Sequence, residues 1–440
     1  MSESIGSTGP GMKLHTKILL GLAVGLAAGV TTNLTVGVDN PTVEWVNRFI
    51  AGPVGQIFLR MLFMVVMPLV FASIALGVAG LGDIRKVGRV GGKAIAYFFV
   101  TTCLAATLGL VVVNVMRPWE RVAPETRVEL MERFAGDAST RVEAAATTAK
   151  FGPETFVNIV PRNPIDAAAK TDMLAVIFFG LMFGAALTLM AVEKSKPMID
   201  WLEALNEVVI KIIGFAMALA PYGVACLIFT VSSRFGFDLM IAVAAFVVTV
   251  LIALALHVVI TLFSILKFGL GLSPLVFVNR IKAALITAFS TSSSSATLPT
   301  GLEVSESQLG IPRKVAGFVL PIGSTMCMNG TAIFEGITVI FLAEIFGVDL
   351  TIPQMGIVMI MSVITAIGAA GVPGGSIPLL VGILTMFGVP GEGIAIVLGV
   401  DRILDMSRTT VNVFSDLTAT VFVAKSEGQW TAADVPQLSK

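Results

Sequence analysis

A stretch of 28 residues without a charged side chain, residues 239–266, constrains this chain more than any other feature. A helix of that length measures about 42 Å at 1.5 Å per residue, which is enough to cross the ~30 Å hydrocarbon core of a bilayer at a tilt. Composition agrees, because 55% of the residues are hydrophobic and only 13% are charged. The charged fraction is about half of the ~25% usual in globular proteins. The sequence therefore predicts an integral membrane protein.

The ionisable and sulfur-containing residues exclude several other classes of protein. The formal net charge is zero, so no basic surface indicates a nucleic-acid partner. Three cysteines are too few for a disulfide framework, and two histidines are too few for a histidine-built metal centre. We expect neither a cofactor nor nucleic acid.

Further apolar stretches indicate an all-α fold with eight spanning helices. Besides 239–266, they lie at roughly 14–36, 50–81, 91–116, 172–193, 204–235, 313–345 and 389–424. Two more apolar stretches, 283–306 and 352–385, are interrupted by Ser, Gly and Pro.

The loops predict how the chain is oriented. Residues 1–12 lack the pattern of a cleavable signal peptide, and we interpret them as a cytoplasmic tail. Lys and Arg gather in the loops on the side of this tail, so the positive-inside rule places both termini in the cytoplasm. The connection 117–172 carries 17 charges of mixed sign and is expected outside, with partial helices. The sequence thus predicts a multi-pass protein of the cell (inner) membrane.

Three polar segments interrupt the apolar C-terminal part. In a bilayer, irregular backbone is tolerated only inside protein or beside a cavity. The serine run 290–297 has apolar flanks, which favours a re-entrant hairpin over a flexible linker. The Gly/Pro segment 366–376 predicts a second hairpin rather than a plain loop. Asn329-Gly330, inside the stretch 313–345, suggests a local unwinding whose carbonyls can coordinate alkali cations.

The last helix carries a stripe of polar side chains. At 100° per residue its members fall within an arc of about 80°; they are Asp401, Asp405, Arg408, Asn412 and Asp416. A charge at the bilayer centre costs roughly 2.5–3.5 kcal/mol, so the stripe indicates a function. Three carboxylates against Arg408, with Arg402 pointing elsewhere, form a negative pocket that invites cations. The alternative is a self-neutralising ion-pair network that holds helices together. His257, alone in an apolar helix, is expected to be a hydrogen-bonded packing residue rather than a proton relay.

In order, the eight helices, serine-tip hairpin, interrupted helix, Gly/Pro-tip hairpin and final helix DRILDMSRTTVNVFSD resemble the dicarboxylate/amino acid:cation symporters. These are the family of glutamate and aspartate transporters. The resemblance implies inverted repeats and a homotrimer that works as an elevator, with the two hairpin tips as gates. It implies a scaffold at 13–90 and 117–236, a transport domain at 91–116, 237–270 and 271–425, and cytoplasmic tails at 1–12 and 426–440.

The resemblance also assigns a substrate site. Arg408 would pair with the side-chain carboxylate of the substrate, a bidentate task that suits guanidinium, and Asp405 would accept its ammonium group. The remaining substrate residues would be Thr409, Asn412, Thr331, Met328, Ser293, Ser294, Gly371 and Val372. Because relatives for neutral amino acids lack the arginine and those for C4-dicarboxylates lack the aspartate, the pair implies aspartate or glutamate.

The cation sites of the family match less well. One sodium site would use Asp416 with the carbonyls of Asn412 and Gly323, and a second would use Thr325 with the carbonyls of Ala366, Ile367 and Ala369. A third is degenerate, since Cys327, Asn329 and Phe98 replace an amide, a carboxylate and a tyrosine, and only Thr101 and Thr102 remain.

Sodium prefers hard oxygen ligands, so a thiol and a neutral amide predict sodium coupling that is weakened, reduced in number or lost. Protons carried by Asp401, Asp405 or Asp416 are the alternative. A second arginine that many relatives place at one of two positions is also missing, because Ser292 and Met406 stand there.

Three other hypotheses remain. Ser and Gly tips can line an anion-conducting channel. A membrane enzyme with a serine nucleophile is disfavoured, because no histidine or lysine base lies near the serine run. A receptor that binds the ligand without moving it is the third.

Overall fold

The computed structural model describes residues 12, 14–37, 40–82, 89–122, 160–170, 173–369 and 371–431. Every regular element within these ranges is helical. Most of the predicted tails at 1–12 and 426–440, the loop residues 83–88 and most of the 117–172 connection lie outside the described residues. The all-α class is therefore confirmed for the described part of the chain.

The described residues of the N-terminal half are almost entirely helical. The 117–172 connection contributes a 3-10 turn, Pro118–Arg121, and the short helix α9. The helices are α1 (Leu14–Val36), α2 (Pro41–Val46) with a π turn (Asn47–Ala51), α3 (Gly52–Phe63), α4 (Val66–Gly82), α6 (Arg89–Met116), α9 (Pro164–Ala169) and α10 (Met173–Leu189).

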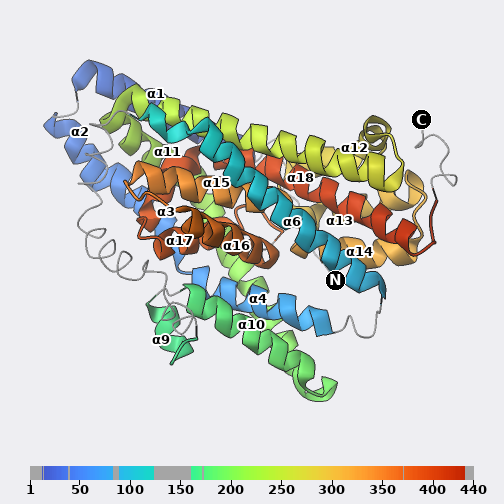
Figure 1. The fold of residues 1–440 in the computed structure, drawn as a ribbon. Helices are drawn as coiled ribbons and strands as arrows, with labels where there is room; N and C mark the ends of the chain where they lie inside the picture. Colours follow the sequence, from blue (N-terminus) through green and yellow to red (C-terminus); the bar gives the residue numbers. More distant parts are fainter. Residues whose placement is uncertain are drawn as a thin grey trace.

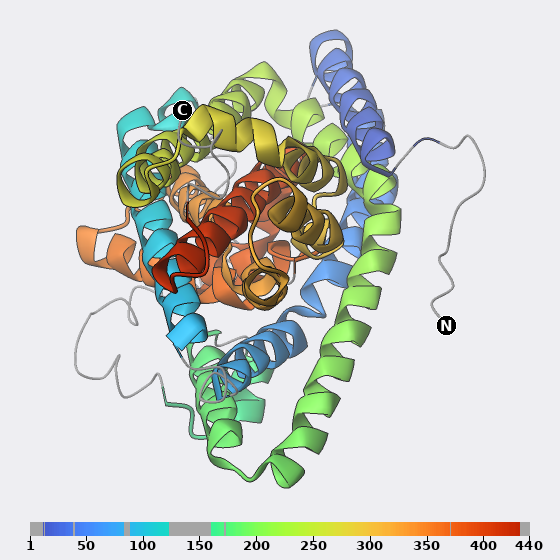
Figure 2. The ribbon, with the colours of Figure 1, turned by 90° about the vertical axis from the view of Figure 1, so that its right-hand side faces the viewer.

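One helix replaces two predicted ones. The sequence predicts separate helices at 204–235 and 239–266, but α11 runs without interruption over 65 residues, Val192–Leu256, and continues into the π-helical segments His257–Leu262 and Ile265–Leu270. The two predicted spans remain as separate apolar stretches of this run, Val192–Arg234 and Leu239–Leu270. The helix continues between them because residues 235–238 contain no proline and only one glycine, and a single glycine rarely ends a helix. Figure 2 shows the run changing direction in its second half.

A row of glycines packs α1 against the first part of α11. A Cβ at Gly25 would lie 3.0 Å from the backbone carbonyl carbon of Ala225, and one at Gly21 would lie 3.1 Å from that of Pro221. Small residues four apart allow helices in a membrane to approach this closely. The second part of α11 lies elsewhere, because Phe246 stacks on Phe341 at 4.7 Å between ring centroids.

The C-terminal half contains two helix–turn–helix units, α12–α13 and α16–α17. Each is followed by a long helical stretch, broken in the first case (α14 and α15) and continuous in the second (α18). The helices are α12 (Pro274–Thr291), α13 (Ser294–Ser307), α14 (Arg313–Met326), α15 (Asn329–Ile345), α16 (Ile352–Gly368), α17 (Ile377–Met386) and α18 (Ala395–Ser426), with a 3-10 turn (Gly391–Ile394) before α18.

Length and apolar composition make six of the described helical stretches long enough to cross a membrane. They are Thr16–Val36, Pro41–Leu76, Arg89–Arg121, Val192–Arg234, Leu239–Leu270 and Arg313–Ile345. The predicted span 172–193 corresponds to a shorter apolar helix, Ala175–Leu189. The predicted span 389–424 corresponds to α18, whose charged stripe lowers its hydropathy. The chain is thus a multi-pass membrane protein, and the number of eight spans stays a prediction.

Burial distinguishes the centre of the protein from its surface. Helix α18 lies near the middle of the view in Figure 2, and nearly every residue of α15 is buried. By contrast, α1 exposes large apolar side chains such as Leu20, Val24 and Leu34. At the edge of the bundle α4 and α10 lie side by side (Figure 1), with Phe71 stacked on Phe179 at 5.5 Å. Apolar exposure of this kind fits a lipid-facing surface.

Candidate substrate and cation site

The serine run forms the turn between α12 and α13. Helix α12 ends at Thr291, Ser292 adopts a left-handed conformation with φ of 52°, and Ser293 precedes α13. The Ser293 hydroxyl caps α13 by accepting a hydrogen bond from the Ala296 N–H at 3.1 Å. We call Ser292 and Ser293 the serine tip. The hairpin interpretation fits this geometry, and the flexible-linker alternative does not.

The Gly/Pro segment forms the corresponding turn between α16 and α17. We call its described residues, 369 and 371–376, the glycine tip. The Ser293 hydroxyl donates to the Gly371 carbonyl at 2.6 Å, and the Ser295 N–H donates to the same oxygen at 3.2 Å. A Cβ at Gly371 would lie 2.7 Å from the Ser324 carbonyl oxygen, so this approach requires glycine. The two tips are therefore in direct contact.

The interrupted helix lies next to this contact. Cys327 and Met328 separate α14 from α15, so the predicted unwinding is present, although Asn329 and Gly330 already form the first turn of α15. The Gly330 N–H donates to Asn412 Oδ1 at 2.7 Å. A Cβ at Gly330 would collide with the backbone of Arg408. The absence of a side chain thus brings the N-terminus of α15 against α18.

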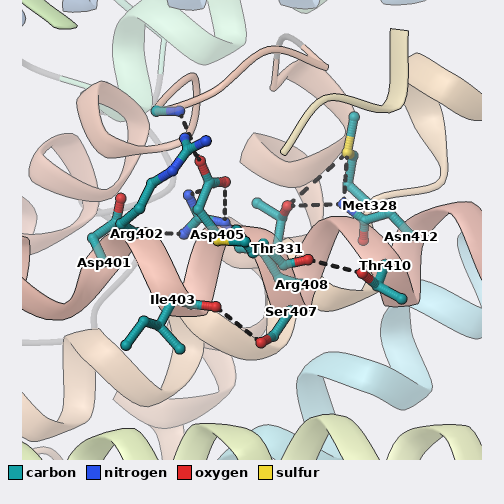
Figure 3. Close-up of polar contacts among 12 residues, drawn as sticks. Met328, Thr331, Asp401, Arg402, Ile403, Asp405, Ser407, Arg408, Thr410 and Asn412 are labelled. Carbon is teal, nitrogen blue, oxygen red and sulfur yellow. Dashed lines mark hydrogen bonds and ion pairs between the residues drawn. The ribbon is translucent and has the colours of Figure 1, made fainter. Parts of the chain in front are cut away.

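Arg408 is the centre of a buried ion-pair cluster on α18 (Figure 3). Its Nη2 lies 2.9 Å from Asp405 Oδ1, its Nε donates to that oxygen at 3.0 Å, and its Nη1 donates to Asp401 Oδ1 at 3.2 Å. The guanidinium carbon lies 4.3 Å from the centre of the Phe334 ring, a cation–π distance. All three charged side chains are buried.

The structure corrects the expected charge of this cluster. Arg402 does not point elsewhere, because it is buried and its Nη1 lies 3.8 Å from Asp405 Oδ2. Two guanidinium groups therefore face the carboxylates of Asp401 and Asp405, and this end of the stripe is balanced rather than negative. The salt bridges all lie within α18, so they do not hold helices together as the ion-pair alternative requires.

A small cavity lies between the two tips, the start of α15 and α18. It leaves about 20 Å³ for the centres of water-sized molecules, which is room for water but not for an amino acid. Nine of the ten predicted substrate residues line it; the tenth, Ser293, joins the tips instead. The lining residues are Ser292, Ser294, Met328, Thr331, Ala369, Gly371, Val372, Ser376, Asp405, Arg408, Thr409 and Asn412.

Asn412 connects the cavity wall to the interrupted helix. Its amide Nδ2 lies 3.3 Å from the Thr331 hydroxyl and 3.1 Å from the Met328 sulfur. With the Gly330 N–H on Oδ1, the amide is held by α15 on both sides. Three residues predicted to bind substrate are thus already fixed relative to one another.

Asp416 lies two turns beyond the cluster, with one carboxylate oxygen unpaired. Within the described residues its Oδ1 is buried and has no hydrogen-bond partner. A Cβ at Gly323 would lie 2.6 Å from this oxygen, so the carboxylate rests on the backbone of α14. The one side-chain donor to this carboxylate among the described residues is the weakly donating Cys327 thiol, so its burial is disfavoured unless a cation balances the charge. This arrangement fits the predicted sodium site of Asp416 and Gly323.

The second predicted sodium site is less well defined. Thr325 is exposed, and its hydroxyl donates to the Ile322 carbonyl at 3.0 Å. Its predicted partners Ala366, Ile367 and Ala369 lie where α16 ends, and the Ala369 N–H already donates to the Ala366 carbonyl at 3.1 Å. This site stays a prediction.

The degenerate site is brought together around Asn329. Its Oδ1 accepts hydrogen bonds from Thr102 at 2.8 Å and Thr101 at 3.5 Å, and its Nδ2 donates to Ser415 at 3.0 Å. The same Nδ2 lies 3.2 Å from His257 Nε2. Cys327 approaches Oδ1 at 4.0 Å, and Phe98 is buried nearby. His257 is thus a hydrogen-bonded packing residue as expected, but its partner at this site was not foreseen.

Sequence reasoning missed Glu335. This side chain of α15 is fully buried; its Oε2 accepts a hydrogen bond from Thr365 at 2.7 Å, and its Oε1 has no partner among the described residues. The signal was present, because Glu335 interrupts an otherwise apolar stretch, and an ionisable residue at membrane depth indicates function. Ser292 and Ser376, which also line the cavity, lie in the two segments that the sequence singled out.

A helical membrane protein with a charged cavity closed between two hairpin tips belongs to the class of membrane transporters. Comparison with known proteins agrees. The chain is 34% identical over 418 residues to the proton/sodium-glutamate symport protein of Geobacillus stearothermophilus, covering 95% of each chain. It is 35% identical over 418 residues to the C4-dicarboxylate transport protein of Bacillus subtilis, covering 95% of this chain and 96% of that one. It is 32% identical over 422 residues to the proton/glutamate-aspartate symporter of Escherichia coli, covering 94% and 93%.

The family model of the sodium:dicarboxylate symporter family matches residues 14–426. The chain belongs to this family, which confirms the resemblance seen in the sequence. It is a transporter and not an enzyme.

Proposed function

We propose that this protein takes up acidic amino acids, aspartate or glutamate, as a secondary active transporter of the cell (inner) membrane. The observation that carries the proposal is the position of Arg408 and Asp405 side by side on the wall of one buried cavity. A guanidinium group binds a carboxylate through two parallel hydrogen bonds, and a carboxylate binds an ammonium group. The pair matches the two ends of an acidic amino acid.

Such a substrate can take over the internal ion pair of Arg408 and Asp405, and the net negative charge that it brings can be balanced by a co-transported cation. In the structure Arg408 holds Asp401 and Asp405. When the side-chain carboxylate of the substrate takes over Arg408, the ammonium group of the same molecule takes over Asp405. A C4-dicarboxylate has no ammonium group, so its second carboxylate would face Asp405, and unbalanced buried charge is strongly destabilising. This favours amino acids over C4-dicarboxylates.

Entry of the substrate requires the two tips to separate. The contacts to be broken are the two hydrogen bonds to the Gly371 carbonyl and the bond from the Gly374 N–H to Asp405 Oδ2 at 3.2 Å. All of them involve the glycine tip, whose small residues allow large backbone changes. We therefore assign the gate to the glycine tip and the fixed wall to α18.

We infer that sodium is a coupling ion at a reduced number of sites. The unpaired oxygen of Asp416 supports one sodium site. The degenerate site is not expected to bind sodium, because the Asn329 amide is already satisfied by protein partners. Sodium ions are here co-transported cargo. The second site, at Thr325 and the end of α16, rests on the family resemblance alone.

Proton coupling is a second candidate, and Glu335 favours it. A fully buried glutamate with one bonded and one free oxygen can hold a proton in a membrane without a counter-ion. If Glu335 carries the proton, Glu335→Gln abolishes the dependence of uptake on an inward proton gradient. If Asp416 is the main coupling residue, uptake by this variant keeps its dependence on sodium.

The movement and the assembly are also proposals. The family resemblance supports a homotrimer with cytoplasmic termini, in which 91–116, 237–270 and 271–425 move as an elevator against a scaffold of 13–90 and 117–236. Cross-linking of the purified protein tests the trimer, and cysteine labelling from each side of the membrane tests the orientation.

The proposed substrate is tested by calorimetry with aspartate, glutamate and succinate on purified protein. We expect aspartate or glutamate to bind and succinate to bind at least about tenfold more weakly, because succinate leaves Asp405 unpaired. Arg408→Ala is expected to weaken binding at least about a hundredfold, as expected when one partner of a buried charge pair is removed. The matched control Arg313→Ala removes an exposed arginine of α14 and is expected to bind like wild type.

Tighter binding of succinate than of aspartate would contradict the proposed substrate class. Proteoliposomes separate the remaining hypotheses. A transporter accumulates labelled aspartate saturably against its gradient, a channel passes anions without accumulation, and a receptor binds without uptake.

A further inference from the structure

Arg402 is a second buried guanidinium beside the cavity that the substrate site does not use. Its side chain is 7% exposed, and it does not line the cavity. Its Nη1 lies 3.8 Å from Asp405 Oδ2, and its Nε has no partner among the described residues. The desolvation of a buried arginine that has only one long contact to a carboxylate costs free energy that packing alone does not offset.

Asp405 links this arginine to the gate. Its Oδ1 accepts from Arg408, while its Oδ2 accepts the N–H of Gly374 in the glycine tip at 3.2 Å and faces Arg402. Gly374 has φ of 73°, and a Cβ there would lie 3.1 Å from the Met217 sulfur of α11. One of the three hydrogen bonds that hold the glycine tip closed therefore ends on the carboxylate oxygen that faces Arg402.

The charges of the cluster cancel only if Arg402 is counted. Asp401 and Asp405 are balanced by Arg402 and Arg408. The other acidic side chain whose charge reaches Arg408 is Glu335 on α15. Without Arg402, both aspartates share Arg408, and Asp405 Oδ2 has no cationic partner until the ammonium group of a substrate supplies one.

We propose that Arg402 is a positioning residue for the return step of the transport cycle, in which the carrier crosses the membrane closed and without substrate. Arg402 holds Asp405, and through it the glycine tip, in the closed position when no substrate ammonium group is present. This inference rests on the proposed uptake of acidic amino acids and adds a role for a residue outside the cavity. Substrate-loaded crossing does not need Arg402, because the ammonium group pairs with Asp405.

Two transport assays in proteoliposomes separate these steps. Exchange of external labelled aspartate for internal aspartate uses only loaded crossing, whereas net uptake into vesicles without internal amino acid also needs the return step. We expect Arg402→Met to slow net uptake about tenfold or more and exchange less than about threefold, because only in the return step is Asp405 Oδ2 left without a cationic partner. Arg402→Lys retains the charge and is expected to recover much of the net uptake.

A double variant sharpens the test. Ser292 lines the same cavity as Asp405, so Ser292→Arg in the Arg402→Met background returns a guanidinium to the cluster from the serine tip. We expect net uptake to rise relative to Arg402→Met alone. A merely structural role for Arg402 would lower exchange and net uptake in equal proportion. An unchanged ratio of the two rates would therefore overturn the inference. Absence of aspartate exchange by the wild type would instead refute the proposed function.

Discussion

Asn329 and Asp416 lie close together around α15 and α18, yet their surroundings differ. Both hydrogen-bonding atoms of the Asn329 side chain are satisfied, Oδ1 by two threonines and Nδ2 by Ser415 and His257. The Asp416 Oδ1 is buried without a partner in the part of the chain that the structure describes. One position is closed by the protein itself, and the other still needs a positive charge.

The chemistry of the two side chains explains the difference. An amide both donates and accepts, so it can complete a network with threonine, serine and histidine. A carboxylate only accepts hydrogen bonds. The residue of α14 that faces Asp416 Oδ1 is Gly323, which has no side chain that could donate one. The comparison teaches that an amide at such a position can be satisfied by protein hydrogen bonds alone, whereas a carboxylate there requires a cation.

Among the substitutions that test this comparison, Asp416→Asn has the largest expected effect. The substitution removes the buried charge that calls for a cation, so uptake driven by a sodium gradient is expected to fall at least about tenfold. The matched control Asp349→Asn changes an exposed aspartate between α15 and α16. Sodium-driven uptake by Asp416→Asn at the rate of the control would break the comparison.

Gly323→Ala tests the geometry of this site without changing its charge. The new Cβ would lie 2.6 Å from Asp416 Oδ1 and 3.0 Å from Cγ, so the carboxylate must move. We expect several-fold weaker sodium dependence of aspartate uptake. Gly317→Ala, on the same helix with open space around its Cβ position, serves as the control. Equal sodium dependence in the two variants would show that Asp416 does not act against the α14 backbone.

Asn329→Asp sharpens the comparison from the other side. The carboxylate keeps the two threonine donors but can no longer donate to Ser415 or His257, so it becomes a buried charge without a cation. We expect a lower Tm in choline than in sodium, a difference larger than that of wild type. Asn329→Ala, which adds no charge, controls for the loss of the amide. If the Tm of Asn329→Asp is the same in both cations, the pocket around residue 329 has lost the capacity to hold sodium altogether.

The smallest expected effect concerns a surface cluster at the end of α18. Hydrogen bonds from Arg89 and Lys93 hold the pKa of Glu427 below its usual value. A lowered folded-state pKa contributes stability above the unfolded pKa of about 4.3, and this contribution is lost as the pH falls through the folded value. Glu427→Gln is therefore expected to lower the Tm slightly at pH 7, and this difference shrinks as the pH falls below about 4.3. A Tm difference that does not shrink between pH 7 and low pH would point to packing instead.

The geometry of the candidate site was largely predictable from local patterns in the sequence. The stripe on α18 follows from helical spacing, and the two helix–turn–helix units follow from Ser, Gly and Pro within apolar stretches. These patterns bring nine of the ten predicted substrate residues to one cavity.

What the sequence did not predict depends on tertiary contacts. Helical spacing places Arg402 about 100° from Asp401, which is about 40° beyond the edge of the stripe. Only its long side chain, packed in the folded protein, brings the guanidinium group back to Asp405. His257 and Asn329 are 72 residues apart, and no local pattern joins them. The continuity of α11 was missed because the spans were bounded by charged residues, and charge does not determine where a helix ends.

The most direct test is the dependence of aspartate affinity on sodium, measured by calorimetry with choline as the balancing cation. We predict that the affinity of wild type rises with sodium, that Asn329→Ala shows the same dependence, and that Asp416→Asn shows little or none. If Asn329→Ala loses the sodium dependence and Asp416→Asn keeps it, the assignment of the two positions is contradicted.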